Sequence, residues 1–392
     1  MLIFHSSNNN KYKYLYLYLL KIGVFTMKIK ANRNDLLKPL LLAGNVIERR
    51  QTLPILANVL ISTSKENLKI TATDLEVEMT TMSKAENSED IEFTVPARKI
   101  IDICKALPEN SNITLEVDGE KAVLKSGRGR YKMSILPARD YPSIEPSSVS
   151  QTIKMPEVSL KKLIDKTSFA MAHQDVRYYL NGLLLEIRSG RMRAVATDGH
   201  RLALSDVDFK LNDIEDLQII LPRKAIVELS RILSDSKNEI EIQISDSHLR
   251  VQSGNTSFIS KLIDGKFPDY ERVMPSSETI ECRADKNYLK QALTRTSILS
   301  NEKYRGIRFR LNKNMLHLQA HNPEQDEAEE ELEVEYEGKE LTIGFNVGYL
   351  LDVLGVIDTD SVVLSVIDSN SSTLISPDKS LDSQYVIMPM RL

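Results

Sequence analysis

The sequence predicts an α+β protein made of three tandem copies of one domain, in which helices cover one face of antiparallel sheets. Three observations support this fold class. One sequence pattern recurs three times, landmarks repeat at a spacing of 126 positions, and helical and strand periodicities alternate in the same order within each copy. A spacing of that size indicates repeated whole domains, because solenoid repeats span only about 20–50 residues.

The recurring pattern is a bulky apolar run, a charged turn and a strand that ends in a polar Thr-Asp or His-Asn pair. It lies at 52–79, 177–204 and 304–324. The landmarks are Pro-Ala-Arg-Lys and Tyr-Pro-Ser, which are echoed by Pro-Arg-Lys and Phe-Pro-Asp-Tyr; they begin at 96, 141, 222 and 267. We place three modules, called modules 1, 2 and 3, at 27–150, 151–277 and 278–392. Each is long enough to hold its own core.

The composition is that of a globular protein that is neither disordered nor membrane-spanning. Of its 392 residues, 42% are hydrophobic and 27% are charged. Its two cysteines, Cys104 and Cys282, lie in different modules and have no CxxC neighbour. This pattern argues against a disulfide framework and a zinc site, and it fits a reducing cytoplasm, where we expect the protein to be located.

Residues 1–26 precede the first module and are rich in Asn, Lys and Tyr. Their apolar run is interrupted by Lys21, is too short to span a bilayer and has no small-residue cleavage site. We therefore expect a disordered or mis-assigned leader, with a targeting segment as the alternative. A strand-like alternation opens module 1 at Met27.

Two helices are expected in each module, because apolar residues recur there at spacings of three and four. Asn34, Asp285 and Asn346 are the expected N-caps, and prolines at 96 and 222 stand just ahead of their helices. Pro39 is unfavourable inside the first helix, since it forfeits one backbone hydrogen bond. The six segments are 32–50, 96–107, 159–177, 222–233, 285–305 and 346–357.

Strands are expected between the helices wherever apolar and polar residues alternate with period two. Such runs lie at 68–72, 113–117, 240–244 and 362–366. This alternation is typical of half-buried antiparallel strands. Each module would therefore pack its sheets against one face of its two helices and leave the opposite helix face free.

Charge is segregated between the helical segments and the remainder of the chain. The six segments hold 19 Lys and Arg against 9 Asp and Glu, a net charge of +10, whereas everything outside them sums to −14. A basic helix surface on an acidic body is typical of a protein that holds a polyanion on one face. The alternative is six ordinary solvated helix faces.

The terminal modules carry opposite local charges. Residues 324–335 contain eight carboxylates, whereas module 1 has Arg128, Arg130 and Lys132 in a segment whose counterpart in module 2 is uncharged. A tandem chain with complementary ends can join a second copy head to tail, and a rotation that closes gives a ring. The alternative is an acidic edge strand that resists aggregation.

Catalysis is not expected. The sequence has no Walker A pattern, no GxSxG elbow, no HExxH and no Rossmann fingerprint, and its six histidines do not cluster. Asp198 and His200 invite an acid–base interpretation, but no nucleophile or third group accompanies them. We expect the segment around them to form a strand-to-loop wall, with Gly199 allowing close backbone approach, and we expect no cofactor and no metal.

Several long motifs carry a resemblance to a known family. They are HQDVRYYLNG at 173–182, VATDGHRLA at 195–203, FPDY at 267–270, ILSNEK at 298–303, GFNV at 344–347 and MPMRL at 388–392. In this order they closely resemble the bacterial DNA polymerase III beta subunit family, the sliding clamps, and the resemblance covers 27–392. It implies a head-to-tail homodimer that closes a ring of six clamp domains around duplex DNA, without sequence specificity and without catalysis.

The resemblance also implies partners and sites. The partners are the replicative polymerase catalytic subunit, an ATP-driven clamp loader, and translesion polymerases and mismatch-repair proteins that bind by short linear motifs; no membrane is involved. The implied dimer contacts are Ile298, Leu299 and Tyr131, with Arg128 and Arg130 facing Asp326, Glu327 and Glu330. The implied DNA-facing residues are Arg50, Arg98, Gln174, Arg223 and Lys224.

The family further has a peptide-binding cleft between its middle and last modules. Methionine, leucine, valine and proline would make a deformable apolar trough, and Arg177, His200 and Arg201 would offer directional polar contacts. Asn370 stands where the family has a valine at the rim of this cleft. By resemblance the cleft comprises Arg177, Tyr179, Leu180, Thr197, Gly199, His200, Arg201, Leu202, Pro268, Arg272, Val273, Asn346, Tyr349, Ser372, Val386, Met388, Pro389, Met390, Arg391 and Leu392.

Two rival functions remain open at this point. The first is a peptide-binding scaffold with a basic surface that does not encircle DNA, and it predicts DNA retention no better than that of any basic surface. The second is an enzyme acting at the Thr-Asp-Gly-His-Arg segment at 197–201. It predicts that His200→Ala abolishes a turnover, whereas the clamp interpretation predicts only weaker partner binding.

Overall fold

The structure is a computed structural model, and it describes residues 28–48, 53–64, 66–87, 89–144, 148–188, 190–208, 215–275 and 278–391. These residues form two compact units. The first unit holds the described residues up to 144 together with 250–259, and the second holds 148–249 and 260–391. The predicted leader lies outside the described residues.

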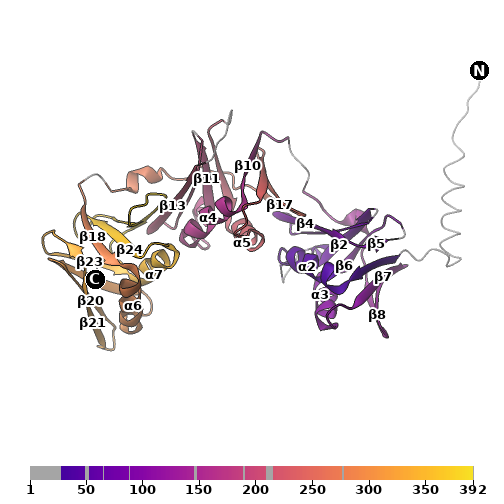
Figure 1. Ribbon diagram of the computed structural model, residues 1–392, viewed down its shortest axis with the longest axis horizontal. Helices are drawn as coiled ribbons and strands as arrows, with labels where there is room; N and C mark the ends of the chain where they lie inside the picture. The colour runs from indigo at the N-terminus through magenta and orange to yellow at the C-terminus, as the bar shows by residue number, and fades with distance from the viewer. Residues whose placement is uncertain are drawn as a thin grey trace, which may run out of the picture. The chain divides into compact units, whose positions relative to one another are not determined.

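The same succession of elements occurs three times along the described chain: a strand, a helix, a group of strands, a second helix and a closing strand group (Figure 1). The α+β class is therefore confirmed. The module bounds themselves stay a prediction. The elements of the first copy are β1 (Lys28–Asn32), α2 (Arg33–Gly44), β2 (Asn58–Ser64), β3 (Asn67–Thr73), β4 (Val77–Lys84), β5 (Glu86–Asn87), β6 (Glu92–Pro96), α3 (Ala97–Ala106), β7 (Asn112–Asp118), β8 (Lys121–Ser126) and β9 (Gly129–Ser134).

The second and third copies follow the same order. The second comprises β10 (Gln151–Pro156), α4 (Glu157–Thr167), β11 (Gly182–Arg188), β12 (Arg191–Thr197), β13 (Arg201–Asp208), β14 (Leu217–Pro222), α5 (Arg223–Ile232), β15 (Glu239–Ile244), β16 (His248–Ser253) and β17 (Thr256–Lys261). The third comprises β18 (Ile280–Asp285), α6 (Lys286–Thr296), β19 (Gly306–Asn312), β20 (Met315–His321), β21 (Glu327–Glu333), β22 (Glu335–Tyr336), β23 (Leu341–Asn346), α7 (Val347–Val356), β24 (Ser361–Val366), β25 (Thr373–Pro377) and β26 (Ser383–Ile387).

In the first unit, one antiparallel sheet has the strand order β5-β1-β7-β8-β9, so that β9 lies at its edge. The strands β6, β2, β3 and β4 pair in that order in a second antiparallel sheet. Helix α2 packs on β3 and β4 and against α3. Leu36 and Leu40 of α2 and Ile61 and Ile70 of the strands are almost completely buried between these layers.

The second unit is organised by a nine-stranded sheet with the order β14-β11-β12-β13-β26-β25-β24-β18-β22. Because β13 pairs antiparallel with β26, from Arg201↔Ile387 to Ser205↔Ser383, this sheet runs without a break from module 2 into module 3. Helix α4 packs on β12 and β13, and α6 packs against α7 (Figure 1). A separate four-stranded sheet has the order β21-β20-β19-β23, with β21 at its edge.

The predicted strands are confirmed as β3, β7, β15 and β24, and all have antiparallel partners. The six helices exist in the described part of the chain, but three of them are shorter than predicted. Helix α2, predicted over 32–50, ends at Gly44, and residues 45–48 are not helical. Helix α4 ends at Thr167 and α6 at Thr296, so the predicted continuations to 177 and 305 are wrong. Both threonines are buried and donate their hydroxyls to the carbonyls of Leu163 and Ala292, four residues back. Such bonds compete with the helical pattern, and a short 3-10 turn follows each.

The expected caps are confirmed at Asp285 and Asn346, whose side chains accept from the backbone of Tyr288 and Gly348. Asn34 is not the cap of α2; that role belongs to Asn32, which accepts from the Asn34 amide. Pro39 is buried inside α2, and the helix continues past it to Gly44. No helix in the described part of the chain is long and apolar enough to cross a membrane.

Candidate functional site

The turn between β12 and β13 is a self-contained hydrogen-bonded structure. The Thr197 hydroxyl donates to the carbonyl of Arg201 at 2.6 Å and accepts from the Gly199 amide at 3.1 Å. One oxygen of Asp198 accepts from the amides of His200 and Arg201 at 2.9 and 3.0 Å. The Asp198 carboxylate is thus occupied by backbone groups, and the acid–base pair that the sequence suggested is not assembled here.

The same turn exists in module 1, where it follows β3. The Thr73 hydroxyl donates to the carbonyl of Val77 at 2.8 Å and accepts from the Leu75 amide, and Asp74 accepts from the amides of Glu76 and Val77. The Thr-Asp turn is therefore part of the repeated architecture. Because the same hydrogen bonds occur in modules 1 and 2, they do not indicate a function. Any difference between the two turns must come from the residues around them.

Gly199 is the residue that sets the module 2 turn apart. Its φ is +88°, and a Cβ atom built on it would lie 2.9 Å from Nη2 of Arg177. The Arg177 guanidinium therefore occupies the space that any side chain at 199 would need. Its Nε and Nη2 donate to the two oxygens of Asp175 at 3.0 and 2.9 Å, which lowers the pKa of that carboxyl to about 2.

An apolar floor lies beneath this turn. Leu180, Leu202 and Val386 belong to one buried cluster with Phe267 and Tyr270, and they are only 1%, 4% and 2% exposed. Tyr179 and Val273 pack against the same cluster and are half-buried. The first three residues are therefore core residues in the free chain, which hold up the surface above them.

The C-terminal segment is held against the turn. After β26 the Met388 amide donates to the carbonyl of His200 at 2.9 Å, and the Met390 amide donates to the carbonyl of Gly344 at 2.7 Å. Pro389 and Met390 are half-buried, whereas Met388 is 38% exposed. Residues 388–391 thus form a strap that connects strand β23 with the turn between β12 and β13, which we call the β13 turn. Leu392 lies outside the described residues.

Arg201 is committed to internal partners. Its guanidinium donates to Asp198 at 3.1 Å, to Asp352 of α7 at 2.5 Å and to the carbonyl of Phe169 at 2.8 Å. It also lies 4.5 Å from the ring centroid of Tyr349. The side chain is only 12% exposed. The expectation that Arg201 offers a directional contact to a peptide does not fit this geometry, because its position and partners make it a tie between β13 and α7. His200 is exposed, and Arg177 is about half exposed.

The other predicted cleft residues are exposed or half-buried. Pro268 is exposed, Arg272 is 83% exposed and pairs with Asp269 at 2.7 Å, and Ser372 is half-buried just before β25. Asn370 is exposed, and its backbone amide donates a hydrogen bond to the Asp368 carboxylate. Asn346 donates its side-chain amide to the carbonyl of Tyr304 at 3.4 Å.

Tyr304 borders the predicted cleft without being one of its predicted residues. It is 57% exposed beside Asn346. Its signal was an aromatic residue that directly follows the 298–303 motif.

The predicted DNA-facing residues lie at helix starts and in one loop. Arg98 is exposed in α3, and Arg223 opens α5 and donates to the carbonyl of Met171 at 3.1 Å. Lys224 follows Arg223 and is half-exposed, and Gln174 is exposed with φ +57°. Arg50 lies outside the described residues.

The positive charge of the helices is smaller than the sequence indicated. The six α-helices of the described residues hold 14 Lys and Arg against 6 Asp and Glu, a net charge of +8. All three lysines of α4 are paired with carboxylates: Lys161 with Asp165, Lys162 with Asp382 and Lys166 with Asp358. The lysines of α4 therefore add little free positive charge to the helix surface, because Asp165 of the same helix and Asp382 and Asp358 from far along the chain pair with them.

The predicted dimer contacts lie at two sheet edges that carry opposite charge. Arg130 and Tyr131 lie on β9 and Arg128 in the turn before it, and all three are exposed. Asp326 and Glu327 are exposed at the start of β21. Ile298 is 75% exposed and Leu299 half-buried in the 3-10 turn Ser297–Leu299.

Glu330 differs from the other predicted dimer contacts, because it already has a partner in its own chain. Arg295 of α6 donates to both of its oxygens, at 2.5 and 2.7 Å. This hydrogen bond lowers the pKa of the Glu330 carboxyl. Among the described residues, no group of His, Cys, Asp and Glu could hold a metal ion.

Three family models together match most of the chain. They describe the N-terminal, central and C-terminal domains of the DNA polymerase III beta subunit and match residues 27–145, 154–269 and 271–391. The chain is 51% identical to the beta sliding clamp of Pseudomonas aeruginosa and 44% identical to that of Escherichia coli K12, each over 367 residues that cover 93% of this chain and all of the relative.

Solved structures agree with these matches. A sliding clamp of Pseudomonas aeruginosa bound to griselimycin superposes with a TM-score of 0.91 at 51% identity, covering 94% of this chain and all of the other. A beta sliding clamp of Caulobacter crescentus superposes with a TM-score of 0.90 at 35% identity, with the same coverage.

Proposed function

This chain belongs to the DNA polymerase III beta subunit family, the beta sliding clamps, and we propose on that basis that it encircles duplex DNA and tethers the replicative polymerase. It is a non-catalytic processivity factor. The observation that carries this conclusion is the match of all three modules to the family's three domains, at 51% identity along 93% of the chain.

The contact with DNA would be electrostatic and free of sequence specificity. Arg98, Gln174, Arg223 and Lys224, with Arg50, are the proposed DNA-facing residues. Lysine and arginine contacts to phosphates position a protein on DNA but read no bases, which is what a partner that slides requires. The lysines of α4 are not included, because their charges are matched within the chain.

Ring closure would join two chains head to tail. The basic β9 edge of one chain, with Arg128, Arg130 and Tyr131, would meet the acidic β21 edge of the other, with Asp326 and Glu327. Ile298 and Leu299 would supply apolar contact beside these charges. A heterologous contact of this kind gives a closed ring when its rotation closes, here a homodimer of six domains.

Partners would dock on the surface formed by the β13 turn and the strap 388–391, above the buried apolar floor. A Met- and Pro-containing surface over an apolar floor suits short peptides from several different proteins. We propose the polymerase catalytic subunit, the ATP-driven clamp loader, translesion polymerases and mismatch-repair proteins as its users. Griselimycin, which the Pseudomonas aeruginosa clamp binds, is proposed as a ligand of this chain also. The location would be cytoplasmic, with the chromosome.

Primer extension tests this function. On a long, singly primed DNA circle with loader and ATP, adding the chain should lengthen the products of single polymerase binding events many-fold. Product lengths that do not change with the chain would contradict the proposal. The alternative scaffold, which binds peptides without encircling DNA, predicts polymerase binding without this gain in product length.

A further inference from the structure

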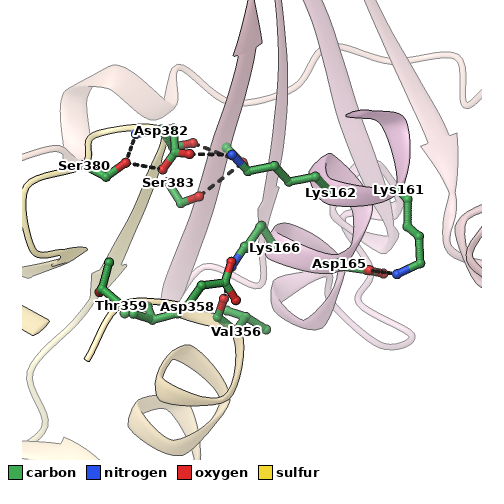
Figure 2. Close-up of polar contacts among 12 residues, drawn as sticks. Lys161, Lys162, Asp165, Lys166, Val356, Asp358, Thr359, Ser380, Asp382 and Ser383 are labelled. Atoms are coloured by element: carbon green, nitrogen blue, oxygen red, sulfur yellow. Dashed lines mark hydrogen bonds and ion pairs between the residues drawn. The ribbon is translucent and has the colours of Figure 1, made fainter. Parts of the chain in front are cut away.

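Two lysines of α4 reach out of module 2 and bind module 3. Lys162 Nζ lies 2.5 Å from Oδ2 of Asp382, and Lys166 Nζ lies 2.5 Å from Oδ2 of Asp358. Lys166 also donates to the carbonyl of Val356. Figure 2 shows both side chains extending from the same helix toward the module 3 segments that carry these acceptors. We call the pairs Lys162–Asp382 and Lys166–Asp358 the latch.

The Lys166 end of the latch fastens helix α7. The Lys166 side chain is only 11% exposed, so its ammonium group needs acceptors in place of water. Val356 is the last residue of α7, and its carbonyl has no partner further along that helix. A cation at this position also complements the negative end of the helix dipole. Lys166 of module 2 thus caps a helix of module 3.

The Lys162 end of the latch fastens strand β26. Asp382 directly precedes β26, and its carbonyl accepts from the Asp206 amide at 2.8 Å and from the Ser205 hydroxyl at 3.1 Å. Ser380 donates to the other carboxylate oxygen at 2.6 Å. Asp382 is therefore bound at its side chain by α4 and at its backbone by β13, so the first residue of β26 cannot shift without breaking these bonds.

Strand β26 leads from the latch to the peptide-binding surface. It begins at Ser383, beside the latch, and its far end runs into Met388 and the strap. The five residues of β26, Ser383–Ile387, therefore separate the latch from the strap, a distance of about 17 Å along an extended strand. Helix α7 makes a second connection, since it carries Tyr349 and Asp352, the partners of Arg201.

We propose that Lys162 and Lys166 are positioning residues for the peptide-binding surface: by fixing β26 and α7 against module 2, they hold the strap 388–391 and Tyr349 in place beside the β13 turn. The proposal rests on the proposed function of that surface. The basic charge of α4 in the sequence had suggested contact with DNA. The proposal gives these two lysines a different role.

Lys161 provides a matched control. It lies next to Lys162 on α4 and is also ion-paired, with Asp165 (Figure 2) and with Asp235, and both of these partners belong to module 2. Reversing its charge changes the net charge of the helix as much as reversing Lys162 does. A loss that depends on helix charge therefore affects both variants, whereas a loss that depends on the latch affects only Lys162.

The test measures binding of immobilised full-length clamp to the polymerase III catalytic subunit by surface plasmon resonance. Lys162→Glu alone should weaken binding and Lys162→Glu with Lys166→Glu should weaken it about tenfold, whereas the charge-matched single variant Lys161→Glu should leave it unchanged. The exchanged pair Lys162→Asp with Asp382→Lys should recover most of the affinity lost by Lys162→Asp alone. In the reversed variant, hydrogen exchange at the Met388 and Met390 amides should accelerate, because these amides hold the strap.

Unchanged affinity in the double reversal, or an equal loss in Lys161→Glu, would overturn the proposal. Retention on circular DNA should be the same for all variants, and a selective loss for Lys162→Glu would reassign that lysine to DNA contact. If the double reversal does not fold, Lys162→Gln and Lys166→Gln measured singly give the same comparison with Lys161→Gln. Absence of polymerase binding by the unmodified chain would instead refute the proposed function.

Discussion

Leu75 and Gly199 occupy the same left-handed position in two copies of one turn, with φ values of +77° and +88°. Both turns are closed by the same Thr and Asp hydrogen bonds. Only in module 2 does a guanidinium, that of Arg177, fill the place of the missing side chain. The same turn therefore occurs twice, and a glycine at position 199 leaves the space that the Arg177 guanidinium occupies beside the proposed partner surface.

Gly199→Ala should displace Arg177 and weaken binding of the polymerase catalytic subunit. The new Cβ would lie 2.9 Å from Nη2 of Arg177, and an alanine with positive φ adds strain of about 1 kcal/mol. We expect a loss of about tenfold, measured by surface plasmon resonance. Leu75→Ala, at the matching place in module 1, is the control and should bind like the unmodified chain. Equal binding by Gly199→Ala would remove Arg177 from the partner surface.

Arg201→Lys should loosen the joint between β13 and α7. Lysine keeps the charge but cannot reproduce three donations in one plane together with contact to the Tyr349 ring. We expect the second unit to lose about 2 kcal/mol of unfolding free energy, measured by urea denaturation. Asp352→Asn removes one charged acceptor and should cost less. If Arg201→Lys is as stable as the unmodified chain, Arg201 is not a structural tie.

Removal of the strap, by a stop codon after Ile387, should abolish polymerase stimulation and leave the dimer intact. Met388 and Met390 hold the strap through their amides, and neither belongs to the proposed dimer contact. Primer extension and analytical ultracentrifugation measure the two properties on the same preparation. A monomeric product would count against the assignment of the strap to partner binding.

Charge reversal at β21 should weaken dimerisation in a salt-dependent way. Glu327→Lys removes an exposed carboxylate from the proposed contact, and its effect should fade as salt screens the charges. Glu330→Lys should also destabilise its own chain, because it leaves Arg295 without its partner. Arg295→Gln isolates that second effect. A dimer dissociation constant that does not change in Glu327→Lys, at low or high salt, would reject the charge-complementarity argument.

The sequence could predict those features of the fold that depend on residues close together in the chain. The strand runs, the Asp285 and Asn346 caps and the threefold succession of elements depend on residues near one another in the chain, and the structure confirms them. The helix ends at Thr167 and Thr296 were missed, because whether a threonine bonds back to the helix depends on how its side chain is buried.

The sequence overestimated the free positive charge of α4 for a different reason. Lys162 finds its carboxylate 220 residues away and Lys166 finds its own 192 residues away, so counting charges along a helix could not reveal that they are neutralised. Arg201 was assigned to peptide contact by resemblance, and its burial among Asp198, Asp352 and Phe169 emerged only from the packing of α7 on β13. Glu330 and Arg295 show the same limit at the proposed dimer edge.

In the proposed function the chain is linked to DNA topologically, as a closed ring. The most direct measurement is retention of loader-assembled clamp on a nicked DNA circle before and after one restriction cut, at unchanged salt. The cut leaves every phosphate contact in place and creates only free ends. The ring predicts that the clamp is lost from the linear DNA and kept on the circle. Equal retention on both forms would mean that the chain only binds the DNA surface, which would contradict the closed ring and favour a scaffold that does not encircle DNA.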